Sequence, residues 1–597
     1  MQSSFDETLQ NMRNEDLSLR LTLLKAKAES PKKAALIAAI KRLYAGDGLR
    51  RIWESLSDLE QAAVAEAAYQ YESVFPGGRV EAKYGAAPPF YDPPEGARSW
   101  YYTNPKYATR MHLLFFSTKQ CRSYFIPTDL AEGLRSFVPK PKEALPEATE
   151  TPPDEEGLQI RTTTPEALAE VMALLRLAEA GDLRVSPKTA MPSAEGIRKM
   201  LECLPMGDFY PPDVAFLPKK RSWEQEIGAI KPVAWARLLV HAGYVDVGGT
   251  KSKLTRKGIK ALSEAPHNIL KELWGKWCEN TRYDEYNRVE AVKGQNAKGR
   301  PMTSKPERRA VIADALLDCP VGKWVGAENF STFMRAADRL FEVARLPARL
   351  YFGDPHYGNL GYSGFGGWNI LQLRYILCLL FEYAATLGMV DVAYVHPDRA
   401  INDLRGIWGA DDLPWLSRYD GLRAFRLTEL GAYCLGMEDH FVPSQPKSSL
   451  VLEIGSNFVI RRKAGTLEPA DRLLVEAWAE PVEPDAWCLN ATLARQAVER
   501  GQRAEEFAAF LRSRDPQPLP QTVEGFLTAA ERDGRAVRCR GEALLFECRD
   551  AATAELICTD KELRAICRPC GPAGITVLAA HAEKFRAGIR KLGLGVV

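Results

Sequence analysis

Apolar residues before Gly243 recur at the spacing of a helix, and a short strand is expected after it. In ARLLVHAGYVDV, Leu238, Leu239 and Ala242 fall on one helical face. Gly243 suits a helix C-cap because glycine tolerates the left-handed backbone, and the aromatic and β-branched residues that follow favour extended backbone. A GGTKS turn leads to a short return strand ending at Thr255, whose hydroxyl can cap a further helix. This order of elements predicts a winged helix-turn-helix unit.

The same pattern occurs a second time in the chain. KLTRKGIKAL at 253–262 and RLTELGAYCL at 426–435 share a basic residue, Leu-Thr, a glycine and a final leucine at the same spacing. AGYVDV at 242–247 precedes the first copy, and LGMVDV at 387–392 precedes the second, with a long insertion in its wing. A third, weaker relative, AGDLRV at 180–185, lacks the Leu-Thr return. Helix, glycine and strand occur together in many folds, but the repetition predicts a tandem array.

Residues 17–44, LSLRLTLLKAKAESPKKAALIAAIKRLY, are predicted to form two helices joined by a basic turn, with the second helix starting near Ser30 and Pro31. This arrangement resembles a SAP-like helix pair, a motif that often binds DNA. A plain helical hairpin fits the pattern equally well. Further along, RMHLLFFSTKQCRSYFIPTDL is predicted to form two strands leading to a turn.

At 597 residues, the chain is long enough for several domains. The segment PKPKEALPEATETPPDEE is rich in Pro and Glu and poor in apolar residues, which is typical of a linker. The expected fold class is multidomain α+β. We predict a helical N-terminal region with the SAP-like pair and short strands at 1–138, a linker at 139–156, a winged-helix region with a basic wing at 157–310, a second, enlarged winged-helix region at 311–445, and an α/β domain at 446–597.

Composition argues against export and membrane insertion. Hydrophobic residues make up 46% of the chain and charged residues 26%, as in ordinary globular proteins. The N-terminus is polar, and Glu382 and Asp391 interrupt the most apolar run, so that run is expected to be a buried helix and strand. Twelve cysteines without an even framework fit a reducing compartment. CRPC at 567–570 lacks the second tight pair that a zinc site would need. We therefore expect a cytoplasmic protein without a metal or cofactor.

Basic charge is concentrated around the first winged unit. Residues 213–309 hold 20 Lys and Arg against 11 Asp and Glu, whereas the whole chain has a net charge of only +2. Five basic residues lie on the wing and the helix start after it, two on the helix expected to enter the DNA groove, three in a cluster before that helix, and two on a later loop. A solvated basic face or a protein-binding surface is the alternative. The candidate DNA-binding residues are Lys219, Lys220, Arg221, Lys231, Arg237, Lys251, Lys253, Arg256, Lys257, Lys260, Lys298 and Arg300.

The second copy of the repeat has other residues where the first copy has basic ones. Glu429 and Cys434 stand in its capped helix, and Trp408, Trp415 and Tyr419 lie in its enlarged wing. Such residues suit a protein interface or an internal packing surface better than phosphate. The two copies are therefore expected to differ in role.

The C-terminal segments resemble a known family. LNATLARQAVERG, LPQTVEGFL, ALLFEC and GITVLAAHAEKFRAGIRKLG, in this order, are similar to the helicase-associated domain found N-terminal to the motor in XPB-type helicases and in many bacterial proteins. The resemblance covers the part of the chain after residue 446 and implies an α/β domain that sits beside a motor and helps it to engage DNA. It also implies a context of bacterial genome defence or repair, where relatives of this architecture tend to occur.

The motor itself is missing from the sequence. A helicase needs a GxxxxGK[ST] loop to hold phosphates, and the chain contains none. We therefore expect a non-catalytic accessory subunit that binds double-stranded DNA and couples a separate helicase, ATPase or nuclease subunit to it. One alternative is a scaffold whose winged helices bind partner subunits. The second is a diverged nuclease in which Glu81 and Lys83 form an ExK strand with Asp58 upstream.

Overall fold

A computed structural model describes residues 3–70, 72–96, 104–117, 123–216, 226–248, 252–296, 298, 302–354, 356–360, 367–399, 409–410, 413–443, 450–537, 539 and 541–597. The chain forms two compact units, one of residues 1–446 and 468–473 and the other of residues 447–467 and 474–597. It is a multidomain α+β protein with several small antiparallel sheets, as predicted. Among the described residues, no helix is long and apolar enough to cross a bilayer.

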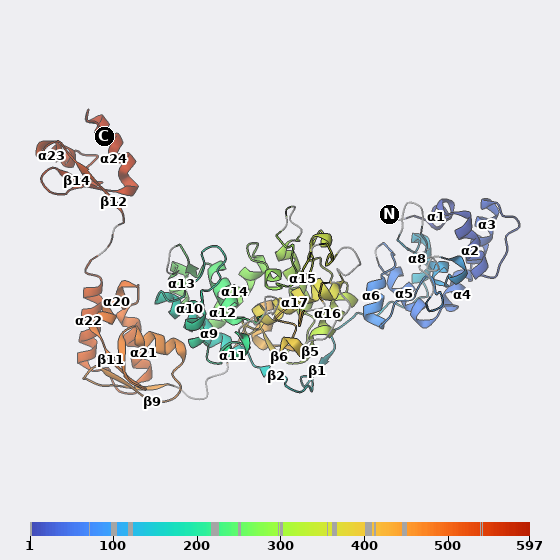
Figure 1. The fold of residues 1–597 in the computed structure, drawn as a ribbon, viewed down its shortest axis with the longest axis horizontal. Coiled ribbons are helices and arrows are strands. Elements are labelled where there is room, and N and C mark those ends of the chain that lie inside the picture. Colours follow the sequence, from blue (N-terminus) through green and yellow to red (C-terminus); the bar gives the residue numbers. More distant parts are fainter. Residues whose placement is uncertain are drawn as a thin grey trace. The chain divides into compact units, whose positions relative to one another are not determined.

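The N-terminal region is largely helical, as predicted (Figure 1). Ser4 and Ser57 each begin a helix with a capping box, in which the serine and a glutamate three residues later satisfy each other's backbone amides. The helices are α1 (Phe5–Asn11), α2 (Asn14–Leu23), α3 (Lys33–Tyr44), α4 (Gly48–Glu54), α5 (Asp58–Ala68), α6 (Gly77–Tyr84), α7 (Met111–Leu114) and α8 (Thr128–Arg135).

Two details of this region differ from expectation. Helices α2 and α3 form the predicted pair, but α3 begins at Lys33, two residues after Pro31, without a side-chain cap. In place of the two strands expected around residues 110–126, the described residues of this stretch form isolated bridges from Phe125 to Phe116 and to Val74, and Met111–Leu114 is a helix. All four residues of α7 are buried, so periodicity could not separate helix from strand here.

A five-stranded antiparallel sheet organises the central region, in the order β1-β5-β7-β6-β2. Every residue of β6 is buried, and β6 pairs with β7 along its length, Val392 opposite Phe425. The predicted linker supplies the edge strand β1, which pairs with β5. The strands are β1 (Ala148–Thr149), β2 (Gln159–Arg161), β5 (Trp324–Gly326), β6 (Val390–Tyr394) and β7 (Leu422–Leu427), and a separate two-stranded hairpin consists of β3 (Val245–Asp246) and β4 (Lys253–Leu254).

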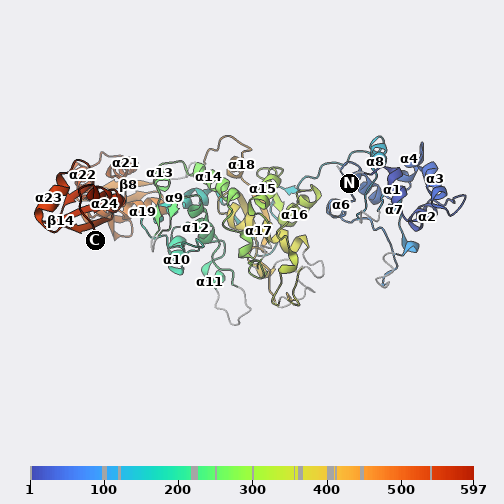
Figure 2. The same ribbon diagram turned by 90° about the horizontal axis from the view of Figure 1, so that it is seen from above.

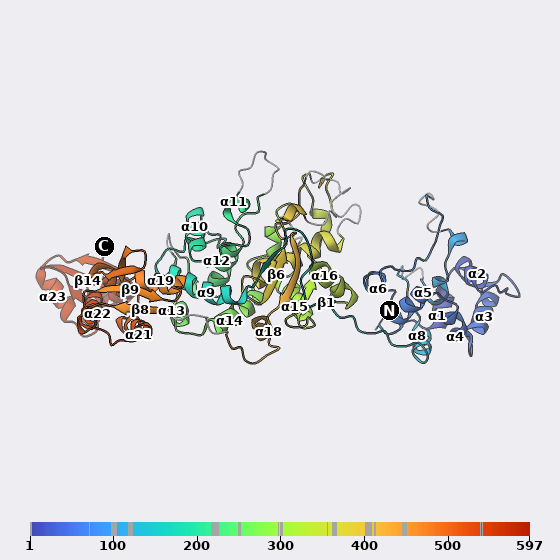
Figure 3. The same cartoon turned by 90° about the horizontal axis from the view of Figure 1, so that it is seen from below.

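One hydrophobic core runs through the whole central region, from Ala167 to Cys434. The boundary predicted at residue 310 therefore divides a single packed core. Helices α9, α10 and α12 lie together in Figures 1, 2 and 3. The helices here are α9 (Thr164–Glu179), α10 (Ala194–Glu202), α11 (Pro212–Ala215), α12 (Lys231–His241), α13 (Arg256–Ala261), α14 (Pro266–Glu279), α15 (Lys305–Leu316), α16 (Ala327–Ala336), α17 (Arg374–Cys378) and α18 (Glu429–Leu435), with π-helical turns on both sides of α17 from Asn369 to Ala384.

The second unit contains two small cores. In the first, Trp478 stacks on Phe507 with ring centroids 5.0 Å apart and donates a hydrogen bond from its indole nitrogen to Gln502. Its elements are β8 (Val451–Ile454), β9 (Val459–Ala464), the end of α19 (Pro469–Glu476), β10 (Ala479–Glu483), β11 (Ala486–Leu489), α20 (Ala491–Glu499), α21 (Ala504–Arg514) and α22 (Gln521–Gly534). The second core belongs to β12 (Ala543–Glu547), α23 (Ala551–Thr559), β13 (Cys567–Pro569), β14 (Gly574–Leu578) and α24 (Ala582–Lys591), with strand order β12-β14-β13.

Candidate nucleic-acid interface

The two copies of the repeated sequence have the same backbone geometry. Thr255 caps α13 by accepting the Gly258 amide at 3.1 Å, and Thr428 caps α18 by accepting the Gly431 amide at 2.9 Å. Gly243 and Gly388, which end the preceding helices, have positive φ of 75° and 74°. The repeat is therefore dictated by the backbone, because each glycine and threonine of the motif fills a conformational or capping requirement.

The third relative is built in the same way with a different hydroxyl residue. Gly181 has a φ of 78°, and a single bridge joins Val185 to Pro192. Ser193 then caps α10 by accepting the Gly196 amide at 3.1 Å. The return that seemed absent from the sequence is present in shortened form, with serine in place of threonine.

The second copy of the repeat, around residues 387–435, is built into the middle of the central region. Its elements α15, β5, α16, the 369–384 helix, β6 and β7 follow one another, and β7 lies between β5 and β6 in the sheet. Every residue of the helix from Ile370 to Ala384 is buried. Trp415 is only 9% exposed and Tyr419 is fully buried. Of the two roles expected for these aromatic residues, the structure shows internal packing, whereas Trp408 lies outside the described residues.

Helix α12, which precedes the first copy of the repeat, is also enclosed. This corrects the prediction that Lys231 binds DNA. The Lys231 side chain is 1% exposed and lies 2.6 Å from Glu170, and it forms a second ion pair with Glu166. Arg161 holds Glu166 from the other side at 2.8 Å. Lys231 is thus a structural cation whose charge is neutralised inside the core, and it cannot reach a DNA phosphate.

Arg237, expected on the same groove-facing surface, is 7% exposed. It donates to the Tyr383 hydroxyl at 3.1 Å and lies 4.0 Å from the Glu382 carboxylate. Burial lowers the pKa of Arg237, but Tyr383 and Glu382 outweigh this effect and raise it, so the guanidinium stays charged. Residues 231–239 of α12 are all buried and only Val240 and His241 at its end are partly exposed, so the helix lacks an exposed face with which to read a DNA groove.

The wing is where cations remain exposed. Lys253 lies on β4 and Arg256 begins α13, both are exposed, and neither has an ion-pair partner among the described residues. By contrast, Lys257 lies 2.7 Å from Glu272, and Lys260 lies 3.0 Å from Glu264. The described part of the wing therefore has fewer exposed and unpaired cations than the sequence suggested. Lys298 is also exposed, whereas Lys219, Lys220, Arg221, Lys251 and Arg300 lie outside the described residues.

The nuclease alternative required a strand at Glu81 and Lys83, and the structure has a helix there. Both residues belong to α6, and successive positions of a helix do not alternate between faces as ExK strand residues do. Lys83 is only 12% exposed and is held 2.5 Å from Glu66. This correction removes the geometry on which the nuclease hypothesis depended.

Sequence reasoning missed the buried ion pairs that surround these helices. Glu285 is fully buried and lies 2.6 Å from Arg309, and Asp284 lies 2.7 Å from Arg308. The adjacent pairs in the sequence, Asp-Glu and Arg-Arg, are the available signal, but in the sequence the two arginines look like the end of a basic surface loop. In the described part of the chain, no group of three or more His, Cys, Asp or Glu is placed to hold a metal ion.

Comparisons with known proteins assign no family to this chain. No protein-family model matches it, and no curated protein matches it.

Proposed function

We propose that the chain is a non-catalytic DNA-binding accessory protein built on winged-helix units, which couples a separate helicase, ATPase or nuclease subunit to double-stranded DNA. The observation that carries the proposal is the exposed pair Lys253 and Arg256, on a hairpin and the helix start beside it, where neither has a neutralising carboxylate among the described residues. Cations at such positions fit phosphate oxygens.

The mode of binding follows from what is buried. Because α12 and the 369–384 helix are enclosed, neither can supply base contacts in a major groove. The wing would instead bind the phosphate backbone. Such binding has little sequence preference and depends strongly on salt.

The coupling role rests on the C-terminal resemblance. The segments that carry the resemblance form α20, α22, β12, β14 and α24 in this chain. In α20, Asn490 caps the helix by accepting two backbone amides, which explains the polar residue that opens LNATLARQAVERG. The sequence contains no phosphate-binding loop, so an ATP-driven motor would be another polypeptide.

The second candidate function is a protein scaffold. It is favoured by Lys257 and Lys260, whose charges are already balanced by Glu272 and Glu264. Two exposed and unbalanced cations on the described part of the wing are a small electrostatic footprint for DNA, and many winged domains bind proteins.

Titration of the full-length protein with duplex DNA at several salt concentrations separates the two. We expect Lys253→Gln/Arg256→Gln to weaken binding and to flatten the slope of log affinity against log salt by about 0.9 for each phosphate that is no longer neutralised. The matched control, Lys253→Arg/Arg256→Lys, keeps both charges and should bind as the wild type does. Binding that is unaffected by the glutamine variant, or absent at low salt, would favour the scaffold.

A further inference from the structure

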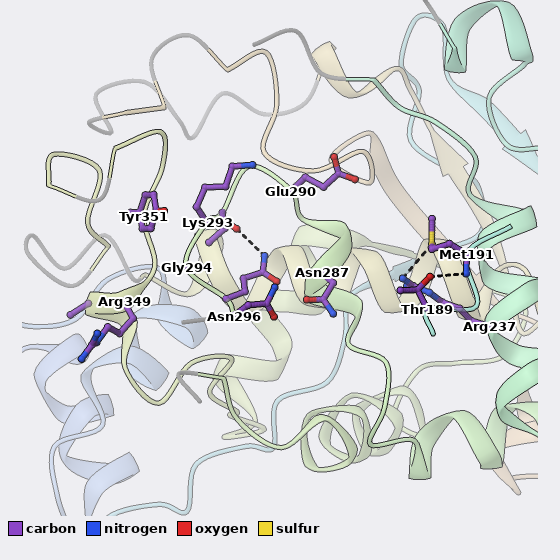
Figure 4. A pocket seen from close by; sticks show the side chains of 13 residues that line it. Thr189, Met191, Arg237, Asn287, Glu290, Lys293, Gly294, Asn296, Arg349 and Tyr351 are labelled. Atoms are coloured by element: carbon purple, nitrogen blue, oxygen red, sulfur yellow. Dashed lines mark hydrogen bonds between the residues drawn. The ribbon is translucent and has the colours of Figure 1, made fainter. Parts of the chain in front are cut away.

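A pocket of about 900 Å³ in the central region does not gather its charges at one point (Figure 4). Arg237 lies at the opposite end of its lining from Arg349 and Tyr351, and Glu290 contributes an exposed carboxylate. Opposite charges meet instead on the central sheet, where acidic residues of the predicted linker bind basic side chains of the strands.

Residues 150–158 of this linker form a strap across one face of the central sheet. Strand β1 ends at Thr149 and pairs with β5 on one side, and β2 begins at Gln159 and pairs with β6 on the other. The strap therefore has to cross β5, β7 and β6, which lie between β1 and β2. Leu158 packs there on a small cluster that is separate from the main core and is formed by Trp324, Ala393 and Ala424.

The strap is acidic and holds a cation at each of the three strands that it crosses. Four of its nine residues are acidic and none is basic. Glu150 lies 2.9 Å from Lys323, which precedes β5. Glu155 accepts two hydrogen bonds from Arg423 of β7, at 2.8 and 3.0 Å. Arg399, which follows β6, donates to a carbonyl of the strap at 2.7 Å. The strap is thus an anionic chain bound to a cationic sheet face.

A β-bulge turns Arg423 toward the strap. Ala393 of β6 pairs with Ala424, but the next residue of β6, Tyr394, pairs with Leu422, so Arg423 is an extra residue in β7. Without it, the alternation of the strand would direct this guanidinium into the main core. Bulges commonly re-aim a side chain in this way beside functional sites. The fold therefore departs from regular pairing at the residue that binds the strap most closely.

The strap has room to lift while both of its ends stay paired. Four strand spacings separate β1 from β2, or about 20 Å, whereas the chain from Thr149 to Gln159 can extend to about 33 Å. The packing beside it is incomplete, because Pro153, Glu155 and Arg423 line a cavity of about 200 Å³. The Glu155 and Arg423 side chains are 33% and 16% exposed, and ion pairs that reach solvent contribute little to holding a segment in place.

We propose that the strap covers a binding surface for a single nucleic-acid strand, whose phosphates replace the strap on Lys323, Arg399 and Arg423. Guanidinium and ammonium groups pair with phosphate oxygens as they do with carboxylates. The strap is one extended chain, so the space that it leaves fits one strand better than a duplex. Both edges of the sheet are paired with β1 and β2, which closes them to an added peptide strand. This surface is separate from the wing, and the proposal does not rest on duplex binding there.

Titration of the full-length protein with a fluorescent oligothymidylate tests the surface. The strap variant Glu150→Gln/Glu155→Gln should bind on the order of tenfold more tightly than the wild type, since each partly exposed ion pair holds the strap by a factor of about five at most. The matched control Glu147→Gln/Asp154→Asn removes two charges from exposed linker side chains that have no ion-pair partner among the described residues. It should bind as the wild type does.

Further substitutions in the strap variant locate the site. Adding Lys323→Gln/Arg423→Gln should abolish the gain in affinity, whereas adding the wing substitutions Lys253→Gln/Arg256→Gln should preserve it. Thermal melting verifies that each variant is folded. If the strap variant binds no more tightly than its matched control, or if the gain persists without Lys323 and Arg423, the proposal is wrong, whatever the outcome for duplex DNA at the wing.

Digestion with a glutamate-specific protease follows the strap in the unaltered protein and does not depend on any variant. A saturating concentration of the oligothymidylate should accelerate cleavage after Glu150, Glu155 and Glu156, because the bound strand displaces the strap, and mass spectrometry identifies the cut sites. Unchanged or slower cleavage at these residues would show that the strap stays on the sheet, which contradicts the proposal.

Discussion

Lys231 Nζ lies 2.6 Å from Glu170 Oε1, and both side chains are almost completely enclosed. The Trp235 indole nitrogen donates to the other oxygen of the same carboxylate at 2.9 Å. Helices α9 and α12 are thus joined by a buried charge pair whose groups all have partners. A lysine that the sequence pattern predicted on a DNA-binding face instead links two helices of the core.

Replacing Lys231 with methionine should destabilise the protein by about 3–5 kcal/mol, because Glu170, whose pKa burial raises, would lose the cation that stabilises its buried carboxylate. Urea unfolding measures this loss. Adding Glu170→Gln should recover part of it, since the neutral amide no longer needs a counter-charge. The folded Lys231→Met protein should bind DNA with unchanged affinity, and a loss of DNA binding at full stability would return Lys231 to the DNA interface.

The Glu285–Arg309 pair should make stability depend on acidic pH. Burial acts to raise the pKa of Glu285, but Arg309 and further hydrogen bonds outweigh burial and hold it below the ordinary value of 4.5. The unfolded chain therefore takes up this proton at a higher pH than the folded one. The stabilisation is fully present above about pH 4.5 and is lost as the pH falls through the lower folded value.

Unfolding measured between pH 7 and pH 3 tests this. Glu285→Gln should lower stability at pH 7 by about 3–5 kcal/mol, since Arg309 loses its buried partner, and should reduce the slope of stability against pH below 4.5. An equal slope in wild type and variant would show that Glu285 does not contribute to the acid transition.

The repeated glycines should be intolerant of alanine. A Cβ on Gly258 would lie 2.2 Å from the Tyr244 carbonyl oxygen, and one on Gly431 would lie 2.1 Å from that of Met389. Either substitution should cost about 1–3 kcal/mol or more, because the capped helix must move away from the strand. Gly275 in α14 has open space around its Cβ position, and Gly275→Ala should stabilise by roughly 0.5–1 kcal/mol. Thermal melting of the three variants checks this contrast, and equal effects would contradict it.

The local elements could be predicted because local requirements determine them. Gly243 and Gly388 must adopt positive φ, and Thr255 and Thr428 must cap, so their spacing in the sequence reveals the unit. A search for Leu-Thr misses the third copy, because its helix is capped by Ser193, whose hydroxyl does the same as that of a threonine.

The position of Lys231 could not be predicted in the same way. Its partners Glu166 and Glu170 are 65 and 61 residues away in the sequence, and a lysine beside apolar residues is typical of an exposed flank. The same holds for Arg237, whose hydrogen bond to Tyr383 spans 146 residues. Lys231 and Arg237 can be buried because distant residues provide their partners. The pattern of a single sequence does not show which distant residues these are.

The protein should neither hydrolyse ATP nor cleave DNA. The sequence has no phosphate-binding loop, and Glu81 and Lys83 lie on a helix, where Lys83 is held by Glu66. Incubation with magnesium and plasmid DNA should leave the DNA intact, and ATP should not be consumed. Magnesium-dependent cleavage that disappears in Glu81→Ala would restore the nuclease interpretation.

The two repeated units should respond oppositely to substitution. Trp415 is 9% exposed and lies edge-on to His396, with ring centroids 5.7 Å apart, inside the enlarged loop of the second unit. Trp415→Ala removes a large buried ring, which should cost about 3–5 kcal/mol and lower the melting temperature, while the folded protein should keep its DNA affinity. Lys253→Gln/Arg256→Gln should show the reverse, with unchanged melting and weaker DNA binding, because both side chains are exposed. Thermal melting and DNA titration of both variants, at a temperature where each is folded, would reveal the difference. If Trp415→Ala weakens DNA binding without loss of stability, the second unit contacts DNA and the roles assigned to the two copies are reversed.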